Sequence, residues 1–445
     1  MVSIVLLLLS IAFIIVTTTR FKLHPFLALL AASFLFGVLS GMPLEQIIDS
    51  INNGFGSTIG NIGLIIIAGI IIGTFLEKSG GAYTLANNIL KIIGVKSVHS
   101  AMAFIGYFVS IPVFADSGFI ILSPLNKAVT KKAGLSLAGT AIALSLGLTA
   151  THTMVPPTPG PIAAAGILEA DLGTVILIGI ITSLLALLVT IVFAKKMGSR
   201  IYINPAPEMD EDQINLKMAQ APSAMKSFLP IIIPIILIIL KSIAEYPTQP
   251  FGEGDFKSII SFIGNPVVAL FVGMIVAFFL PQKLDKEMFS AIGWIGEALK
   301  NAAIIILITG AGGAFGKVLQ SSDISVMLEN SFSGPGLGIW LPFLVAATIK
   351  SAQGSSTVAI ITTASIVAPL LPAMGFDSSA SKALVVIAIG AGSAVVSHAN
   401  DSFFWVVTQM SNMNVNQGYK LHTLGTAIFG LTAILILFVL SFFIV

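Results

Sequence analysis

The chain has 445 residues, of which 56% are hydrophobic and only 9% carry a charge, and its formal net charge is +2. Soluble domains have about 25% charged residues, so we predict an all-α polytopic membrane protein. The small net charge argues against a nucleic-acid partner. Because cysteine is absent, disulfides and thiolate metal sites are excluded. The sequence also lacks nucleotide-binding, metal-binding and hydrolase motifs, so we expect no cofactor and no enzymatic activity.

The apolar runs, from residues 1–17 to residues 421–445, are numerous enough for about ten crossings of about 20 residues each. Residues 1–17 have no basic residue before them, which favours a retained span over a cleaved signal peptide. Lysine and arginine concentrate in cytoplasmic loops. This rule places Arg20 and Lys22 inside and, after ten crossings, both chain ends outside.

The polar stretch 196–226 is predicted to be a cytoplasmic linker between two halves, 1–195 and 227–445, that repeat one another. The repeated residues lie about 240 positions apart: Gly56, Asn61, Ile65, Ile66, Gly73 and Phe75 recur as Gly296, Asn301, Ile305, Ile306, Gly313 and Phe315. Each half has an odd number of predicted crossings, so the halves are inverted relative to each other. Inverted repeats interrupted at matching places are typical of secondary transporters, with the site where the halves meet.

The run 98–125 is predicted to be a re-entrant hairpin, which enters and leaves the membrane from the cytoplasmic side. A single crossing would put Lys127 and the lysines after it outside, against the charge rule. The centre of this run also holds Pro112 and Asp116, which a straight helix disfavours. The stretch 337–371 forms the corresponding hairpin of the second half and enters from the outside.

A broken helix follows each hairpin, at about 136–170 in the first half and 381–410 in the second. The first is interrupted beside His152, by four prolines that begin at Pro156, and the second is interrupted beside His398. Non-helical backbone inside a membrane is tolerated only where protein buries it or where it lines a watery cavity. We therefore expect the two hairpin tips and the two breaks to surround one central cavity.

The hairpin tips supply the candidate anion site. A half-helix N-terminus presents unpaired N–H groups and a partial positive charge, which favours an anion when a hydroxyl lies beside it. Ser355, Ser356 and Thr357 fit this description at the second tip, and Ser117 and Gly118 at the first. The hydroxyls of the second tip could instead serve as helix N-caps, or do both.

Ionisable residues at membrane depth are candidates for carrying a proton, because such groups are costly there and usually functional. They are Asp116, Asp401, His152 and His398. Asp116 could instead cap the restarting half-helix, and a lone histidine is more often a satisfied core residue. His152 and His398 differ from that case because they occupy matching breaks. With Thr153 and Asn400, they are also candidates for binding substrate hydroxyls.

The remaining histidines, His24, His99 and His422, lie near the ends of segments and are predicted to be interfacial. Lys350 precedes the second tip and could pair with an anionic substrate. We expect it instead to extend its ammonium group towards the outer surface, as lysines near segment ends often do.

Four segments resemble the gluconate permease family of proton-coupled sugar-acid transporters, within the larger ion-transporter superfamily. They are residues 113–124, 152–161, 351–357 and 397–402, and the likeness extends over nearly the whole chain. The resemblance implies import of gluconate or a related small hydroxy-monocarboxylate by proton symport across a bacterial inner membrane. It also implies a homodimer in contact with membrane lipid, with a scaffold domain and an elevator-type transport domain that carries both hairpins.

In this interpretation the substrate carboxylate rests on Ser355, Ser356 and Thr357. Asp116 or Asp401 carries the proton, with a histidine as the alternative. The sequence does not choose among gluconate, glycerate, D-serine, 2-keto-3-deoxygluconate and hydroxybutyrate-like substrates, or between proton and sodium coupling.

An anion channel and an intramembrane hydrolase are the two alternative functions. An anion channel would need a continuous polar pore, whereas the candidate residues lie near mid-membrane between apolar flanks. An intramembrane hydrolase could be built on Ser402 and His398, but this pair lacks a recognised nucleophile setting.

Overall fold

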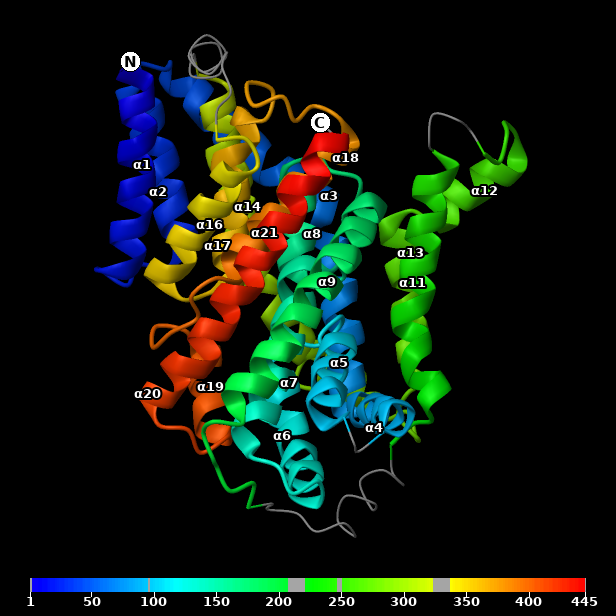
Figure 1. Ribbon diagram of the computed structural model, residues 1–445. Helices are drawn as coiled ribbons and strands as arrows, with labels where there is room; N and C mark the ends of the chain where they lie inside the picture. The colour runs from blue at the N-terminus through cyan, green and yellow to red at the C-terminus, as the bar shows by residue number, and fades with distance from the viewer. Residues whose placement is uncertain (1, 95–96, 207–220, 246–249, 323–336, 445) are drawn as a thin grey trace.

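The computed structural model describes residues 2–94, 97–206, 221–245, 250–322 and 337–444. Within these ranges the chain folds into helices and contains no β-strand, which confirms the predicted all-α class. Figure 1 shows that most helices run along the long axis of the molecule and that both chain ends lie at the same end.

The first half of the chain contains nine helices within the described residues. They are α1 (Val2–Thr19), α2 (Pro25–Leu39), α3 (Leu44–Lys78), α4 (Gly81–Ile93), α5 (Val98–Val109), α6 (Ala115–Lys132), α7 (Leu137–Met154), α8 (Pro159–Ile167) and α9 (Leu172–Gly198). Local sequence explains several of their starts. Pro25 occupies the first turn of α2, where its missing N–H costs nothing. Asp171 caps α9 by accepting a hydrogen bond of 2.8 Å from the Thr174 amide.

The second half holds the remaining helices. They are α11 (Ala224–Ala244), α12 (Asp255–Ile263), α13 (Pro266–Ala277), α14 (Trp294–Gln320), α16 (Trp340–Gln353), α17 (Ser356–Val367), α18 (Ser379–Ala394), α19 (Ser402–Met410), α20 (Val415–Gly418) and α21 (Leu424–Ile444), with a π-helical turn at Tyr419–Thr423. The predicted linker 196–226 includes the connection between α9 and α11, but its first and last three residues are helical; its residues 207–220 lie outside the described part of the chain.

Six of the described helical stretches are long and apolar enough to cross a membrane by themselves. They are Leu44–Lys78, Leu137–Ile167, Leu172–Gly198, Ala224–Ala244, Lys286–Gln320 and Val415–Ile444. A seventh is possible if α12 and α13, which meet at an angle of 61°, form one bent span. Shorter apolar helices, among them α2, α5, α17 and α18, occupy other runs of the sequence. The protein is therefore an integral membrane protein with several apolar helices.

Helix interruptions occur in all four regions where the sequence predicts them. Residues 110–114 separate α5 from α6, residues 155–158 separate α7 from α8, residues 354–355 separate α16 from α17, and residues 395–401 separate α18 from α19. In the first half, the flanking residues Asp116 and His152 are helical, in the first turn of α6 and the last turn of α7.

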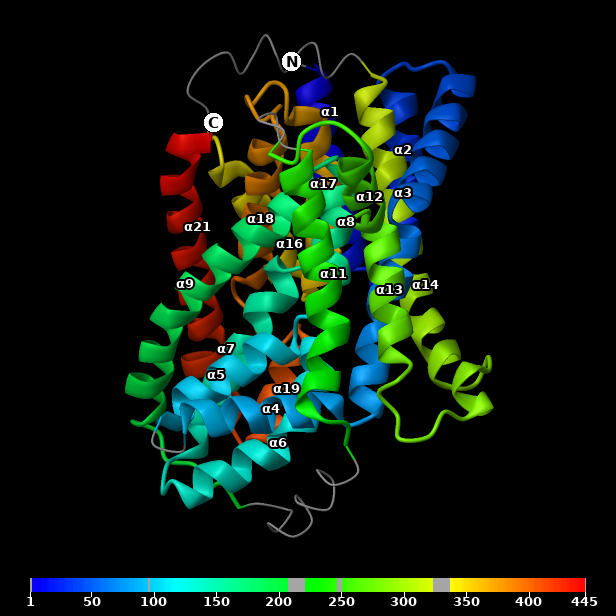
Figure 2. The ribbon, with the colours of Figure 1, turned by 90° about the vertical axis from the view of Figure 1, so that its right-hand side faces the viewer.

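Helices α3 and α14, which contain the residues matched in the predicted repeat, pack side by side and cross closely (Figure 2). The crossing uses small residues: a methyl group on Gly54 would lie 2.9 Å from the Ala314 Cα, and one on Gly313 would lie 2.7 Å from the Thr58 Cβ. In lipid, where the hydrophobic effect does not drive helices together, such small residues allow the backbones to approach.

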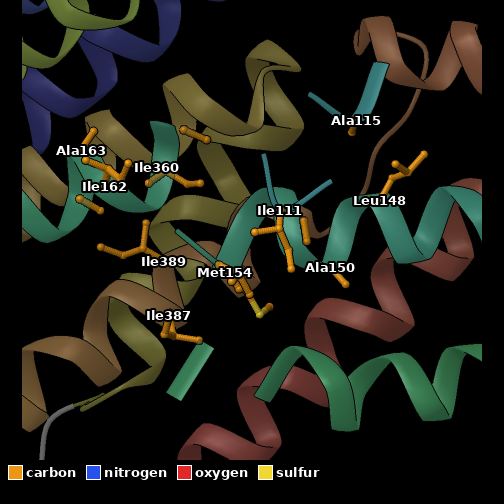
Figure 3. Close-up of a cluster of buried hydrophobic side chains, with 14 of the residues drawn as sticks. Ile111, Ala115, Leu148, Ala150, Met154, Ile162, Ala163, Ile360, Ile387 and Ile389 are labelled. Atoms are coloured by element: carbon orange, nitrogen blue, oxygen red, sulfur yellow. The ribbon is translucent and has the colours of Figure 1, made fainter. Parts of the chain in front are cut away.

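An apolar core lies directly behind the interruptions (Figure 3). Its side chains include Ile111, Leu148, Met154, Ile162, Ile360, Ile387 and Ile389, all at most 6% exposed. They come from the α5–α6 connection and from α7, α8, α17 and α18. This packing joins the broken helices of both halves into one body, so the polar residues at the interruptions are held by a common support.

Candidate functional site

A cavity of about 560 Å³ lies where the interrupted helices meet. Its wall is formed by Phe114, Ala115, Asp116, Ser117, Thr149, His152, Thr153, Asn301, Ile304, Ile305, Lys350, Gln353, Gly354, Ser355, Ser356, Thr357, Ala394, Ser397, Asn400, Asp401, Ser402, Phe403 and Thr426. Both halves of the chain contribute, and all four interruptions supply or adjoin lining residues. Within the described residues, no three His, Asp or Glu side chains are grouped so that they could hold a metal ion.

Most of the residues predicted from the sequence lie in this wall. They are Asp116, Ser117, His152, Thr153, Ser355, Ser356, Thr357, Asn400 and Asp401. Gly118 and His398 are not part of it. A methyl group on Gly118 would lie 2.7 Å from Leu148 Cδ2, so this glycine serves the contact between α6 and α7. The His398 Nε2 lies 2.9 Å from the Ser351 carbonyl oxygen, which directs the ring towards α16.

The turn between α16 and α17, the predicted second hairpin tip, combines a helix cap with a hydroxyl that ties it to α18. Ser355 Oγ accepts a hydrogen bond of 3.3 Å from the Val358 amide, so this serine does cap α17, as one of the two interpretations expected. Ser356 Oγ donates to the Ser393 carbonyl at 2.9 Å and thereby ties the tip to the end of α18. Since capping satisfies only one of the amides at the start of α17, the partial positive charge of this helix end remains directed at the cavity region.

Asp116 connects the two halves across the cavity. Its Oδ2 accepts a hydrogen bond of 2.9 Å from Ser402 Oγ, at the start of α19. The N-cap position of α6 is Phe114, and no side chain caps that helix. The alternative in which Asp116 caps the restarting half-helix is therefore wrong. The cap role belongs instead to Asp401, whose Oδ1 accepts a hydrogen bond of 3.0 Å from the Phe403 amide at the start of α19.

Lys350 points inward, and the expectation that it extends to the outer surface is wrong. Its side chain is 3% exposed, and its Nζ lies 2.6 Å from Asp401 Oδ2. The same ammonium donates to the Gly354 carbonyl oxygen at the turn between α16 and α17. A lysine extends to the surface when no counter-ion is available in the interior; here Asp401, 51 residues away in the sequence, supplies one.

The sequence analysis predicted that His422 is interfacial, and this prediction is also wrong. It is fully buried. Its Nε2 lies 3.0 Å from Ser397 Oγ and its Nδ1 lies 3.2 Å from Ser145 Oγ. Ser397 in turn donates to Asp401 Oδ2. The position of His422 near the end of a segment did not indicate these contacts. They form because the π-helical turn that contains His422 folds back against the break at Ser397.

His152 presents an unused polar atom beside the cavity. Its Nδ1 is buried and has no hydrogen-bond partner among the described residues. A buried polar atom without a hydrogen-bond partner is rare in folded proteins, so this nitrogen is available to a ligand in the cavity. The ring lies 6.0 Å from that of Phe114, centre to centre, which limits its orientation.

A second cavity, of about 650 Å³, lies further along α3 and α14. Its wall includes Asn61, Glu169 and Lys317, whereas the first cavity contacts α14 at Asn301 and Ile305. The two cavities contact α14 at positions separated by at least eight residues, or about 12 Å of helix. Asn61 and Asn301 are matching residues of the predicted repeat, and sequence reasoning assigned neither of them to a site.

Comparisons with known proteins are consistent with this geometry. A family model described as GntP family permease matches residues 2–443. A gluconate permease of Pseudomonas aeruginosa is 35% identical over 441 residues, which cover 98% of this chain and 96% of that protein. The D-serine transporter DsdX of Escherichia coli is 35% identical over 444 residues, 98% of each protein. The YdaH transporter of Alcanivorax borkumensis shares the fold, with a TM-score of 0.65 at 14% identity over 95% of this chain and 99% of that one.

Proposed function

Because this chain belongs to the GntP permease family, we propose that it is a secondary active symporter that imports gluconate or a related small hydroxy-monocarboxylate with protons. The protein is a membrane transporter and not an enzyme. The observation that carries the proposal is the cavity of about 560 Å³, whose wall combines hydroxyls, the side-chain amides of Asn301, Gln353 and Asn400, one lysine and two carboxylates among the described residues. Ligand cavities measure about 300–1,000 Å³ and orient the ligand with a few polar groups. The proposed location is the bacterial inner membrane.

The proposed substrate contacts follow from the wall. The carboxylate rests at the start of α17, near Ser355, Ser356 and Thr357, where a half-helix N-terminus favours an anion. His152 and Asn400 bind substrate hydroxyls: the former has an unpaired Nδ1, and the latter exposes its amide beside Ser351, to whose carbonyl it donates at 2.9 Å.

Ser117 lines the cavity beside Asp116 and stays a candidate substrate contact, whereas Thr153 and His398 have more indirect roles in this proposal. Thr153 lines the cavity but already donates to the Thr149 carbonyl at 3.0 Å, which leaves its oxygen as an acceptor. His398 holds the second tip through Ser351. The candidate proton carriers are Asp116, Asp401 and the two histidines of the breaks.

The proposed architecture has two inverted repeats, 1–195 and 227–445, ten crossings, two re-entrant hairpins and two broken helices. In it, α5–α6 and α16–α17 are the hairpins, and α7–α8 and α18–α19 are the broken helices. The helix interruptions, the shared position of the chain ends and the pairing of α3 with α14 support this arrangement. We also propose a homodimer and an elevator-type movement, and both rest on the family resemblance alone.

The two cavities support alternating access. In an inverted repeat, the two halves exchange conformations when the transporter changes its open side. Asn301 lines the first cavity and Asn61, its repeat partner, lines the second. We therefore assign the first cavity to cytoplasmic access and the second to external access, separated by packing such as that between Gly312 and Ile361.

Single-cysteine variants test this assignment, because the natural chain has no cysteine. We expect Asn301→Cys to react with a membrane-impermeant thiol reagent from the cytoplasmic side and Asn61→Cys from the external side of oriented vesicles. Thr182→Cys, at a fully buried position, is the unreactive control. Labelling of both asparagine positions from the same side would contradict alternating access through these two cavities.

The transport activity is tested in proteoliposomes with labelled gluconate. An acidic exterior is expected to drive uptake against a concentration gradient, and a protonophore is expected to abolish that accumulation. Saturation and counterflow of preloaded gluconate separate a carrier from an anion channel, which shows neither. Uptake that follows an imposed sodium gradient instead would replace proton coupling with sodium coupling.

A D-amino acid such as D-serine is the second candidate substrate. It is favoured by the D-serine transporter relative and by the Asp116 carboxylate in the wall, which can pair with an ammonium group. A thermal-shift panel of gluconate, glycerate, 2-keto-3-deoxygluconate and D-serine separates these substrates, because a ligand at one hundred times its Kd stabilises by about 2.7 kcal/mol. The substrate is the compound that gives the largest shift at the lowest concentration.

A further inference from the structure

Lys350 and Asp401 form a deeply buried pair of opposite charges. Nζ and Oδ2 lie 2.6 Å apart, and the side chains are 3% and 7% exposed. By contrast, the ion pairs Lys78–Glu297 and Lys241–Glu245 each have at least one side chain that is 45% exposed or more. Both Lys350 and Asp401 line the cavity, and Lys350 is the only lysine or arginine in that part of the described wall.

A buried ammonium needs a counter-ion, because an uncompensated charge away from water is costly. In the structure Asp401 is that counter-ion. A substrate carboxylate that entered while Asp401 was ionised would place two anions on one cation. Protonation of Asp401 without substrate would leave Lys350 with only the Gly354 carbonyl oxygen. Substrate entry alone and protonation of Asp401 alone are each unfavourable. When both occur together, the charge of Lys350 is again compensated by one anion.

Building on the proposed function, we propose that Lys350 and Asp401 are the coupling element: a proton neutralises Asp401 and releases Lys350, whose ammonium then binds the substrate carboxylate. The proton arrives from cavity water and forms an O–H bond on Asp401 Oδ2, which loses its hydrogen bond from Lys350. On release the O–H bond breaks to water and the pair re-forms. The local charge is zero in both states, since one proton enters with one carboxylate.

The surroundings of Asp401 accommodate the added proton. Ser397 Oγ, which donates to Oδ2 in the structure, has lone pairs that can accept an O–H from the neutral acid. His422 and Ser145 hold that serine from the other side. His422 is therefore a positioning residue, because it holds Ser397 and lies outside the cavity wall, whereas Ser397 both holds Asp401 and lines the cavity.

Other titratable groups face the pair. They are Asp116 from α6, His152 from α7 and His422 from the π-helical turn, while His398 lies on the same segment as Asp401. Asp116 is the competing proton site, because it also lines the cavity and is bound by the hydroxyl of Ser402. The two carboxylates differ in one respect: only Asp401 is paired directly with the lysine.

The inference is tested in proteoliposomes with labelled gluconate and Asp401→Asn. In the wild type we expect the KM for uptake to rise by up to about tenfold per unit of external pH, as linkage to one proton requires. A potassium-diffusion potential is expected to leave the rate unchanged, since the coupled step moves no net charge. Asp401→Asn is expected to keep gluconate counterflow, to lose more than nine-tenths of its accumulation driven by the pH gradient, and to have a KM independent of pH.

Lys350→Gln and the double variant test whether the charge pair is needed for gluconate binding. Lys350→Gln is expected to raise the Kd for gluconate more than tenfold, measured by thermal shift. If either single variant fails to accumulate, Lys350→Gln combined with Asp401→Asn removes both charges together; it is expected to fold and not to bind gluconate. Glu245→Gln, in the exposed pair with Lys241, is the matched control and is expected to behave like the wild type.

The results that overturn the inference are distinct from those that overturn the proposed function. Retention of pH-driven accumulation by Asp401→Asn, or near-normal gluconate binding by the double variant, removes the pair from coupling. So does loss of pH dependence in Asp116→Asn with its retention in Asp401→Asn, which moves the proton to Asp116. A wild-type protein that transports no hydroxy acid, or is indifferent to the pH gradient, contradicts the proposed function itself.

Discussion

Replacement of Gly354 by alanine is expected to reduce uptake to less than a tenth of the wild-type rate while the protein still accumulates in the membrane. Gly354 has a φ of +92°, a left-handed conformation that costs an L-residue about 1–2 kcal/mol. An added methyl group would also overlap the carbonyl oxygen of Asn400 and lie 2.7 Å from its carbonyl carbon. Both neighbours are backbone atoms, so neither can move aside by changing a side-chain rotamer.

The consequence reaches the cavity because Gly354 lies between its main polar groups. Its carbonyl oxygen accepts from Lys350, and Ser355, the next residue, caps α17. A shift of this turn therefore separates the second tip from the segment that contains Asp401. Binding sites held within fractions of an ångström lose activity steeply when their supports move.

Gly375→Ala is the matched control. Gly375 has a φ of +77°, so alanine suffers the same kind of backbone strain, but no atom lies within 4 Å of the added methyl group. Initial uptake rates, normalised to the amount of protein in the vesicles, measure the difference. Equal rates for the two variants would show that the contact between the tip and Asn400 is dispensable.

Gly147→Ala is expected to give the largest loss of stability. Gly147 lies in α7 where this helix crosses α5, and an added methyl group would overlap the carbonyl oxygen of Ala103 and lie 2.9 Å from the Tyr107 amide nitrogen. Gly106 makes the reciprocal approach from α5. Overpacking costs about 1–3 kcal/mol when side chains can adjust, and we expect at least about 3 kcal/mol here because backbone meets backbone.

The measurement is the Tm of the detergent-purified protein. Gly60→Ala provides the control, since Gly60 lies inside the long apolar helix α3 and an added methyl group there meets no atom within 4 Å. The Tm of Gly60→Ala is expected to stay level or to rise slightly, because alanine favours a helix over glycine. A Gly147→Ala protein as stable as Gly60→Ala would mean that α5 and α7 can separate without loss.

The residues at the cavity show why the sequence reached some of the site and missed the rest. Breaks in apolar helices are local features: proline, glycine and small polar residues interrupt a helix wherever the chain places them. For this reason Asp116, His152 and Ser355 could be selected before their neighbours were known. The roles of Lys350 and His422 could not, because each depends on a partner far away in the sequence, Asp401 for one and Ser145 with Ser397 for the other.

The contrast between local features and long-range packing also explains why the sequence left the helix-capping role of Asp116 open. Whether Asp116 or Asp401 caps a helix depends on the residue at which the helix restarts, and a shift of one or two positions decides it. α6 restarts at Ala115, so Asp116 falls inside the first turn and is available to Ser402. α19 restarts at Ser402, so Asp401 falls at the cap. Packing against neighbouring helices sets these positions, and a single segment carries no information about it.

The sequence by itself determined the class of this protein, the membrane as its solvent and the four places where its helices break, because composition and helix-breaking residues act locally. Family membership then followed from similarity over nearly the whole chain. The expectation that the breaks surround one cavity also came from the sequence, but only the tertiary structure decided that Lys350 turns inward to Asp401 and that His422 supports the site through Ser397. A buried charge is stable only beside its counter-ion, and folding alone brings together two residues from different helices.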